Sequence, residues 1–197
     1  MPAHTDSPRL GDRFVAALAH AFELHQHQVR KGNDIPYMSH LLAVAALVIE
    51  HGGDEEEAIA ALLHDAVEDQ GGLPTLEAIR GRFGERVADI VLGCSDAFGD
   101  AHTVKPPWRE RKVKYLDHFR EASASVRLVS MADKLHNCRS TVADLHATGA
   151  ATWSRFNASR EDQLWFYRTF SDLARALAPS RLADELHRAV LELEALA

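Results

Sequence analysis

One segment of the chain places four side chains capable of metal binding or acid–base chemistry beside an apolar run. It reads LLHDAVED, Leu62–Asp69. On a helix, His64 and Glu68 would lie one turn apart, and so would Asp65 and Asp69. Burying several carboxylates together is costly unless a cation or hydrogen bonds compensate. A divalent metal supplies that compensation, and mixed imidazole and carboxylate ligands suit Mn, Fe, Zn or Co better than Ca or Mg.

Two more polar residues occur inside apolar segments. His40 follows Pro36-Tyr37 at the start of one such segment, and Asp133 lies one turn before Asn137 in another. Taken singly, each has a simpler explanation: His40 as a core or capping residue, Asp133 as a salt-bridge partner, and LLHDAVED as a helix whose charged face meets solvent. Three features of one chemical kind are harder to explain separately, and together they favour a metal site.

The elements that must position these residues are expected to be helices. Apolar residues recur at three- and four-residue spacing, and alternating strand-like segments with hairpin turns are missing. The segments with this spacing are Phe14–Leu24, Leu41–Ile49, Ala58–Val67, Val87–Leu92, Val126–Leu135 and Leu164–Leu177.

Helix ends are marked in the sequence. The run Asp54-Glu55-Glu56-Glu57 predicts a capping box at the start of one helix. Thr75 can cap another, and Pro179 should break the last helical stretch. No repeat, linker or shift in composition indicates a second domain. We therefore predict one all-α domain, a helical bundle over residues 13–197, after a flexible tail over residues 1–12.

Composition narrows the classes of function. The chain has 197 residues, 46% of them hydrophobic, as expected for one globular domain. No apolar run reaches the roughly 18–20 residues that span a membrane, and the N-terminus does not resemble a secretory signal, so we expect a cytoplasmic protein. Two cysteines, Cys94 and Cys138, lie far apart, which disfavours a disulfide framework. A formal net charge of -7 argues against general nucleic-acid binding.

The order His40, His64-Asp65 and Asp133 resembles the H…HD…D signature of the HD superfamily of metal-dependent phosphohydrolases. The flanking blocks look like the hydrolase domain of the Rel/SpoT enzymes, and most like its stand-alone form, the small alarmone hydrolases. The similarity covers about residues 13–177. The blocks that carry it are HQHQVRKG (His25–Gly32), PYMSH (Pro36–His40), ALLHDAVED (Ala61–Asp69), FGERVADIV (Phe83–Val91) and ADKLHNCRS (Ala132–Ser140).

This resemblance implies a role for each matching residue. His40, His64, Asp65 and Asp133 would hold a single Mn²⁺. Glu68 and Asp69 would orient and activate the attacking water, which is general acid–base work. Arg30 and Lys31 would contact the nucleotide and its phosphates, and Asn137 the ribose region. The implied reaction removes the 3′-pyrophosphate of (p)ppGpp, giving GDP or GTP and pyrophosphate.

The chain departs from the pattern of the family it resembles in two places. One is the stretch GNDIPYMSH between Lys31 and the end of the match at His40, and the other is the segment Ser95–Leu116. Between Lys105 and Lys114 there are five basic residues and one acidic residue, so this stretch is either a phosphate clamp or a solvated helix face. Arg111 and Lys112 are the better candidates for substrate contacts. A later block, Thr152–Arg168, contains several aromatic residues; we expect it to cover the pocket, with more of its rings in the core than on the ligand.

Three functions remain open at this stage. The first is (p)ppGpp hydrolysis. The second keeps the site but changes the substrate to a nucleoside monophosphate or to the 2′-phosphate of NADPH. The third is a non-catalytic nucleotide or metal sensor, which is disfavoured because all four ligand positions and both acidic residues are intact. Whether the chain forms a homo-oligomer is left open.

Overall fold

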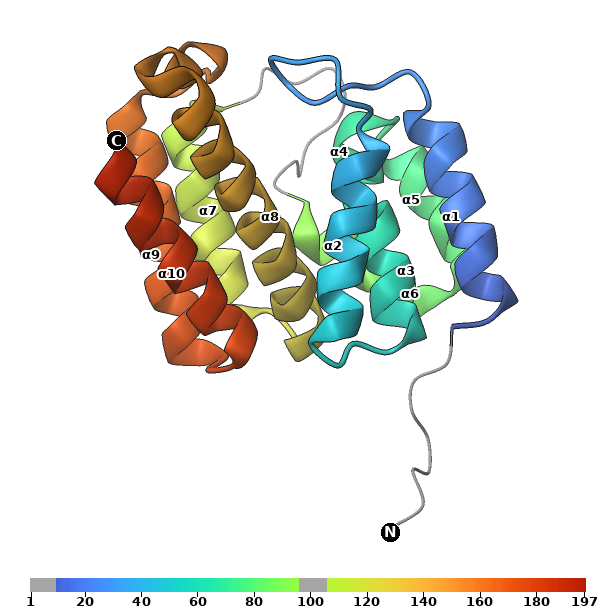
Figure 1. The fold of residues 1–197 in the computed structure, drawn as a ribbon. Helices are drawn as coiled ribbons and strands as arrows, with labels where there is room; N and C mark the ends of the chain where they lie inside the picture. The colour runs from blue at the N-terminus through green and yellow to red at the C-terminus, as the bar shows by residue number, and fades with distance from the viewer. Residues whose placement is uncertain (1–9, 96–105) are drawn as a thin grey trace, which may run out of the picture.

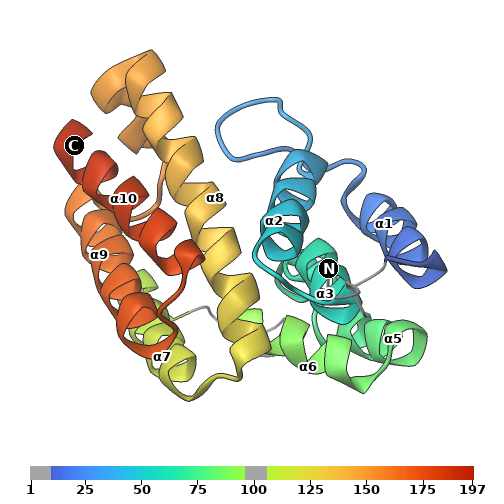
Figure 2. The same ribbon diagram turned by 60° about the horizontal axis from the view of Figure 1, so that its bottom comes forward.

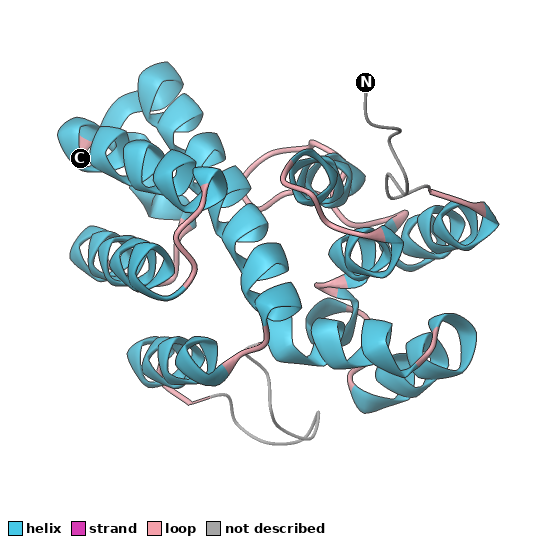
Figure 3. Cartoon of the chain, turned by 90° about the horizontal axis from the view of Figure 1, so that it is seen from below, coloured by secondary structure: helices cyan, strands magenta, loops and turns pink. Residues whose placement is uncertain are grey.

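Helices build the part of the chain that the structure describes. The computed structural model describes residues 10–95 and 106–197, and within them the pairing of extended segments is limited to an isolated bridge between Val29 and Pro36 (Figures 1 and 3). The elements are α1 (Asp12–His25), α2 (Met38–Glu50), α3 (Glu55–Leu63), α4 (Ala66–Asp69), α5 (Leu73–Phe83), α6 (Glu85–Cys94), α7 (Trp108–Glu121), α8 (Ala124–Thr148), the 3-10 helix η1 (Gly149–Arg155), α9 (Arg160–Leu177) and α10 (Arg181–Leu196).

The longest helix, α8, separates two groups of helices. It contacts α2, α3 and α6 on one side and α9 and α10 on the other (Figure 2). Ser123 begins this helix by accepting a hydrogen bond from the Val126 N–H, and Gly149, with φ of 57°, ends it. On the α6 side the helices approach closely, because a Cβ on Gly93 would lie 2.6 Å from a Val126 methyl carbon. Because α8 runs through the middle, its polar residues can reach elements from both groups.

The helix α3 is buried on nearly every side. Its residues Ala58–Leu63 are all buried, as expected for a short helix enclosed by neighbours. The predicted capping box is confirmed at its start, where Asp54 accepts from the Glu57 N–H and Glu57 accepts from the Asp54 N–H. The capping box fixes the start of α3, and the helix ends at Leu63, one residue before His64.

The all-α prediction is confirmed, with three differences in detail. The expected helix through Ala58–Val67 is interrupted at His64 and Asp65, which separate α3 from α4. Helix α5 begins at Leu73 rather than after Thr75, because Gly72 takes a positive φ there. Asp12, assigned to the tail, already belongs to α1, whereas residues 1–9 lie outside the described part, so the tail itself stays a prediction. In the described ranges, no helix is long and apolar enough to span a bilayer.

Candidate functional site

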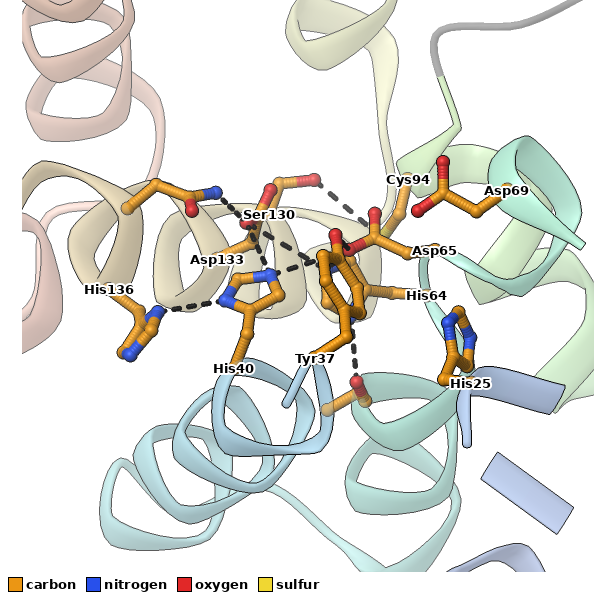
Figure 4. Close-up of polar contacts among 12 residues, drawn as sticks. His25, Tyr37, His40, His64, Asp65, Asp69, Cys94, Ser130, Asp133 and His136 are labelled. Carbon is orange, nitrogen blue, oxygen red and sulfur yellow. Dashed lines mark hydrogen bonds and ion pairs between the residues drawn. The ribbon is translucent and has the colours of Figure 1, made fainter. Parts of the chain in front are cut away.

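Two imidazoles and two carboxylates from three parts of the chain converge between α2 and α8 (Figure 4). His40 comes from the first turn of α2, His64 and Asp65 from the α3–α4 junction, and Asp133 from α8. Nε2 of His40 lies 3.4 Å from Asp65 Oδ2 and 3.3 Å from Asp133 Oδ1. Nε2 of His64 lies 3.0 Å from Asp65 Oδ2 and 3.7 Å from Asp133 Oδ1. The structure thus brings together all four residues that the sequence singled out.

The interruption between α3 and α4 aims His64 and Asp65 at the same point. Both residues keep near-helical dihedrals, with φ of -60° at His64 and -94° at Asp65, and the Asp69 N–H still bonds to the Asp65 carbonyl at 2.9 Å. Nδ1 of His64 lies 2.8 Å from the Ala61 carbonyl oxygen. Because a carbonyl only accepts, Nδ1 carries a proton, and the other nitrogen faces the carboxylates.

His40 is held from its far side by a third histidine. Its Nδ1 lies 2.8 Å from Nδ1 of His136, one turn beyond Asp133 on α8 (Figure 4). Burial, together with the nearby His40 and Arg30, lowers the pKa of His136 to about 4. His136 is therefore neutral near pH 7 and has one ring nitrogen available as an acceptor.

The electrostatics of this cluster favour a positive charge at its centre. Burial works against charge on each member, but mutual attraction prevails: His64 keeps the pKa of Asp65 well below its usual range, and Lys134 and both histidines do the same for Asp133. Burial would lower the pKa of His64, yet Asp65 and Asp133 raise it well above its ordinary value. Asp65 and Asp133 are thus both held in the ionised form close together, an arrangement that a cation between them would stabilise.

A divalent metal fits the residues present. Nε2 of His40 and Nε2 of His64 are both buried, and within residues 10–95 and 106–197 neither has a hydrogen-bond partner. Nitrogen and oxygen atoms of His40, His64 and Asp65 all lie within 4.8 Å of one another, close enough to share one ion. With a metal in place of the proton on Nε2 of His64, two imidazole nitrogens and two carboxylates form a donor set suited to a first-row transition ion.

Tyr37 is a functional candidate that the sequence interpretation did not single out. Its hydroxyl donates to Asp65 Oδ2 at 2.6 Å, and burial together with Asp65 raises the pKa of the phenol well above its ordinary value, so it stays a donor. The ring stacks on His25, with centroids 5.4 Å apart. Its position in PYMSH, three residues before His40, was the available signal.

Asp69, one of the two predicted acid–base residues, is held in place by a hydrogen bond. Gln28 Nε2 donates to Asp69 Oδ2 at 2.8 Å, while Gln28 Oε1 lies 2.7 Å from His25 Nδ1 and 2.5 Å from Gln70 Nε2. Burial and the charge of Asp65 raise the pKa of the Asp69 carboxyl. Glu68 sits beside Asp69 on α4 with a partly exposed side chain. Both carboxylates therefore lie on α4, the short helix that directly follows Asp65. Neither belongs to the group of ligand atoms that could share one ion.

A cavity of about 290 Å³ opens beside the cluster. Four predicted substrate contacts line it: Arg30, Lys31, Lys112 and Asn137. No carboxylate is among the described residues of its wall. Two further cations that the sequence interpretation missed, Lys134 and Arg155, complete a wall with five positive side chains.

Hydrogen bonds join this cavity to the metal cluster. Arg30 donates to Asn137 Oδ1 at 2.7 Å, and the Asn137 amide nitrogen donates to Asp133 Oδ1. Lys31, also in the cavity wall, donates to Asn157 Oδ1 at 2.9 Å. The turn that carries Arg30 and Lys31 needs Gly32, which has φ of +86° and whose added Cβ would lie 3.0 Å from the Arg155 side chain.

The basic residues between Lys105 and Lys114 have different surroundings. Lys112 lines the cavity, with its ammonium 5.2 Å from the centre of the Phe166 ring. Arg111, predicted as its partner, is not in the cavity wall. Arg109 forms an ion pair with Asp162 and stacks over Trp165, a structural role. Lys105 lies outside the described residues.

The aromatic block of residues 152–168 contributes to both core and cavity, and more of its rings line the cavity than we expected. Phe156, Phe166 and Tyr167 line the cavity together with Trp108 of α7. Trp153 and Trp165 pack against the core instead. The cavity thus offers flat apolar surfaces as well as cations.

Known proteins resemble this chain over most of its length. The model of the HD domain family matches residues 17–164. The guanosine-3′,5′-bis(diphosphate) 3′-pyrophosphohydrolase of Xenopus tropicalis is 38% identical over 137 residues, which are 68% of this chain and 70% of that enzyme. The bifunctional (p)ppGpp synthase/hydrolase SpoT of Escherichia coli K12 is 33% identical over 125 residues, or 60% of this chain but only 16% of that longer protein.

A solved structure extends the likeness to the whole fold. The structure of a metazoan ortholog of SpoT that hydrolyses ppGpp superposes with a TM-score of 0.75 at 25% identity, covering 97% of this chain and all of the other. The family match alone covers well over half of the residues. The chain therefore belongs to the HD domain family.

Proposed function

We propose that this protein is a metal-dependent hydrolase that removes the 3′-pyrophosphate of guanosine 3′,5′-bis(diphosphate), giving GDP and pyrophosphate. The observation that carries the proposal is the cavity wall, where five cations and no described carboxylate lie next to the four-residue metal cluster. A nucleotide with phosphates at two positions needs positive charge at more than one place. The relatives named for this activity support the same conclusion.

His40, His64, Asp65 and Asp133 would hold the ion. A donor set that mixes imidazole with carboxylate suits Mn, Fe, Zn or Co, and we propose Mn²⁺ because the resemblance to the small alarmone hydrolases implies it. When bound, such an ion polarises a phosphoryl oxygen and lowers the pKa of water. The cations of the wall bind and orient the phosphates and offset the charge that develops on them. The leaving group is the ribose 3′ oxygen, which takes up a proton as the pyrophosphoryl phosphorus bonds to the water oxygen.

Glu68 and Asp69 are the proposed acid–base pair. The pKa of Asp69 is raised toward neutral pH. Its carboxylate is therefore a better proton acceptor from water than that of an ordinary aspartate. The hydrogen bond from Gln28 fixes the direction in which the carboxylate points. Arg30, Lys31, Lys112 and Asn137 are the proposed substrate contacts; Arg111 stays a prediction from the sequence. Both cysteines are free, which fits the cytoplasmic location we propose.

The test is hydrolysis by chelator-stripped protein reloaded with Mn²⁺, followed by ³¹P NMR. The expected result is release of pyrophosphate from ppGpp, with little reaction on GMP or NADPH. Reloading with Zn²⁺, Co²⁺ and Mg²⁺ tests the choice of ion. Release of orthophosphate from GMP or NADPH without reaction on ppGpp would replace the proposed substrate. Nucleotide binding without turnover under any metal would favour a sensor.

A further inference from the structure

The ring of His40 is hydrogen-bonded on the side opposite the metal cluster to another imidazole. Its Nε2 faces Asp65 and Asp133, whereas its Nδ1 lies 2.8 Å from His136 Nδ1. A neutral imidazole carries one proton, and a short contact between two ring nitrogens needs one donor and one acceptor. The proton between these two rings therefore determines which nitrogen of His40 has a free lone pair.

We propose that His136 is a positioning residue that selects the metal-binding tautomer of His40 by accepting a hydrogen bond from its Nδ1–H. With the proton on Nδ1, Nε2 presents its lone pair to the site, as a metal ligand must. The reverse arrangement, in which His136 donates, would put the His40 proton on Nε2 and point it at the site. This inference depends on the proposed metal centre and not on the substrate.

The second histidine ligand shows why His136 matters only for the first. Nδ1 of His64 bonds to the Ala61 carbonyl, and a backbone carbonyl has no donor form, so that tautomer is fixed by the main chain. His40 has no such backbone partner at its Nδ1. Its tautomer depends on a side chain located three residues after Asp133, on the same face of α8. Helix α8 thus supplies one ligand directly and orients another.

Metal affinity is the measurement that isolates this role. Stripped protein is titrated with MnCl₂ by calorimetry, without nucleotide, for the wild type, His136→Leu and His136→Asn. We expect His136→Leu to weaken Mn²⁺ binding by about 10- to 100-fold, the usual effect of losing a hydrogen bond to a ligating histidine. His136→Asn should recover most of the affinity, because its amide oxygen can accept where Nδ1 did.

The matched control is His146→Leu, the same change further along α8. His146 is exposed and pairs with Glu192, away from the metal cluster. It should leave Mn²⁺ affinity unchanged. Circular dichroism of each stripped variant checks that the fold is kept, and the His136→Asn result keeps the test valid if His136→Leu does not fold.

A spectroscopic measurement reads the tautomer directly. Long-range ¹H–¹⁵N correlations of Zn²⁺-loaded wild type should show the proton of His40 on Nδ1, and an unprotonated Nδ1 on His136. Unchanged or tighter Mn²⁺ binding in His136→Leu, or a proton on His136 Nδ1, would overturn the inference and leave the metal centre intact. Failure of the wild type to bind Mn²⁺ or Zn²⁺ would overturn both.

Discussion

Replacing Lys112 by methionine should raise KM for ppGpp while leaving kcat nearly unchanged. The ammonium of Lys112 lies 5.2 Å from the Phe166 ring centre, 5.6 Å from that of Tyr115 and 6.0 Å from that of Trp108. These distances are within the range of cation–π attraction, which favours positions of the ammonium near the rings. Methionine keeps the apolar stem against the rings and removes only the charge.

The size of the effect follows from the contact that is lost. One charge-assisted hydrogen bond to a phosphate contributes about 1.5–3 kcal/mol. At about 1.4 kcal/mol per factor of ten, KM should rise by about 10- to 150-fold. The matched control is Lys114→Met on the same helix, because Lys114 is exposed and is not among the described residues that line the cavity. It should alter KM much less.

The assay is steady-state hydrolysis of ppGpp with Mn²⁺, measured for both variants and the wild type. Binding of GMP, measured as an inhibition constant, should change far less in Lys112→Met than KM for ppGpp does. An equal rise of KM in the two variants would refute the reasoning, since it would make the effect one of overall charge. Equal losses for ppGpp and GMP would mean that Lys112 does not recognise the second phosphorylated end.

The other expectations concern the metal and the acidic pair. Asp133→Ala should lose the metal, measured by elemental analysis of purified protein; full occupancy would remove Asp133 from the site. Glu68→Gln and Asp69→Asn should keep the metal but lose about 10²–10⁴-fold in kcat, and near-normal turnover in both would exclude the acid–base role. Gln28→Ala should lower kcat with KM and metal content unchanged, whereas a rise in KM alone would mean that Gln28 touches substrate. Adding Mn²⁺ at about 100 times its Kd to stripped protein should stabilise the fold by about 2.7 kcal/mol, seen as a higher Tm; no shift would mean that the ion does not bind the folded state preferentially.

The metal cluster could be anticipated because its residues contradict their surroundings. His40, His64 and Asp133 are buried polar groups in apolar helices, and the sequence shows such exceptions without any knowledge of the fold. Interactions between residues close together in the sequence could also be predicted, as the capping box of α3 shows. The family resemblance then assigned the set to one site, and the structure brings its members together.

The rest depends on contacts between distant parts of the chain. Arg30 and Asn137 are 107 positions apart, and Lys31 and Asn157 are 126 apart, so no local pattern joins them. Arg155 enters the cavity wall only because η1 folds back toward the turn at Gly32. The break between α3 and α4 was missed for another reason: the dihedrals at His64 and Asp65 stay nearly helical, and the periodicity continues through them.

The hydrogen-bond chain from Arg30 through Asn137 to Asp133 is a direct route by which a ligand in the cavity can affect the proposed metal site. A phosphate that engages Arg30 draws on the same guanidinium that orients Asn137, and Asn137 in turn contacts a proposed ligand. The factor by which bound nucleotide changes the affinity for metal must equal the factor by which bound metal changes the affinity for nucleotide. If the two proposed sites are coupled in this way, loss of product from the cavity would change the affinity for the ion, and loss of the ion would change the affinity for the product by the same factor.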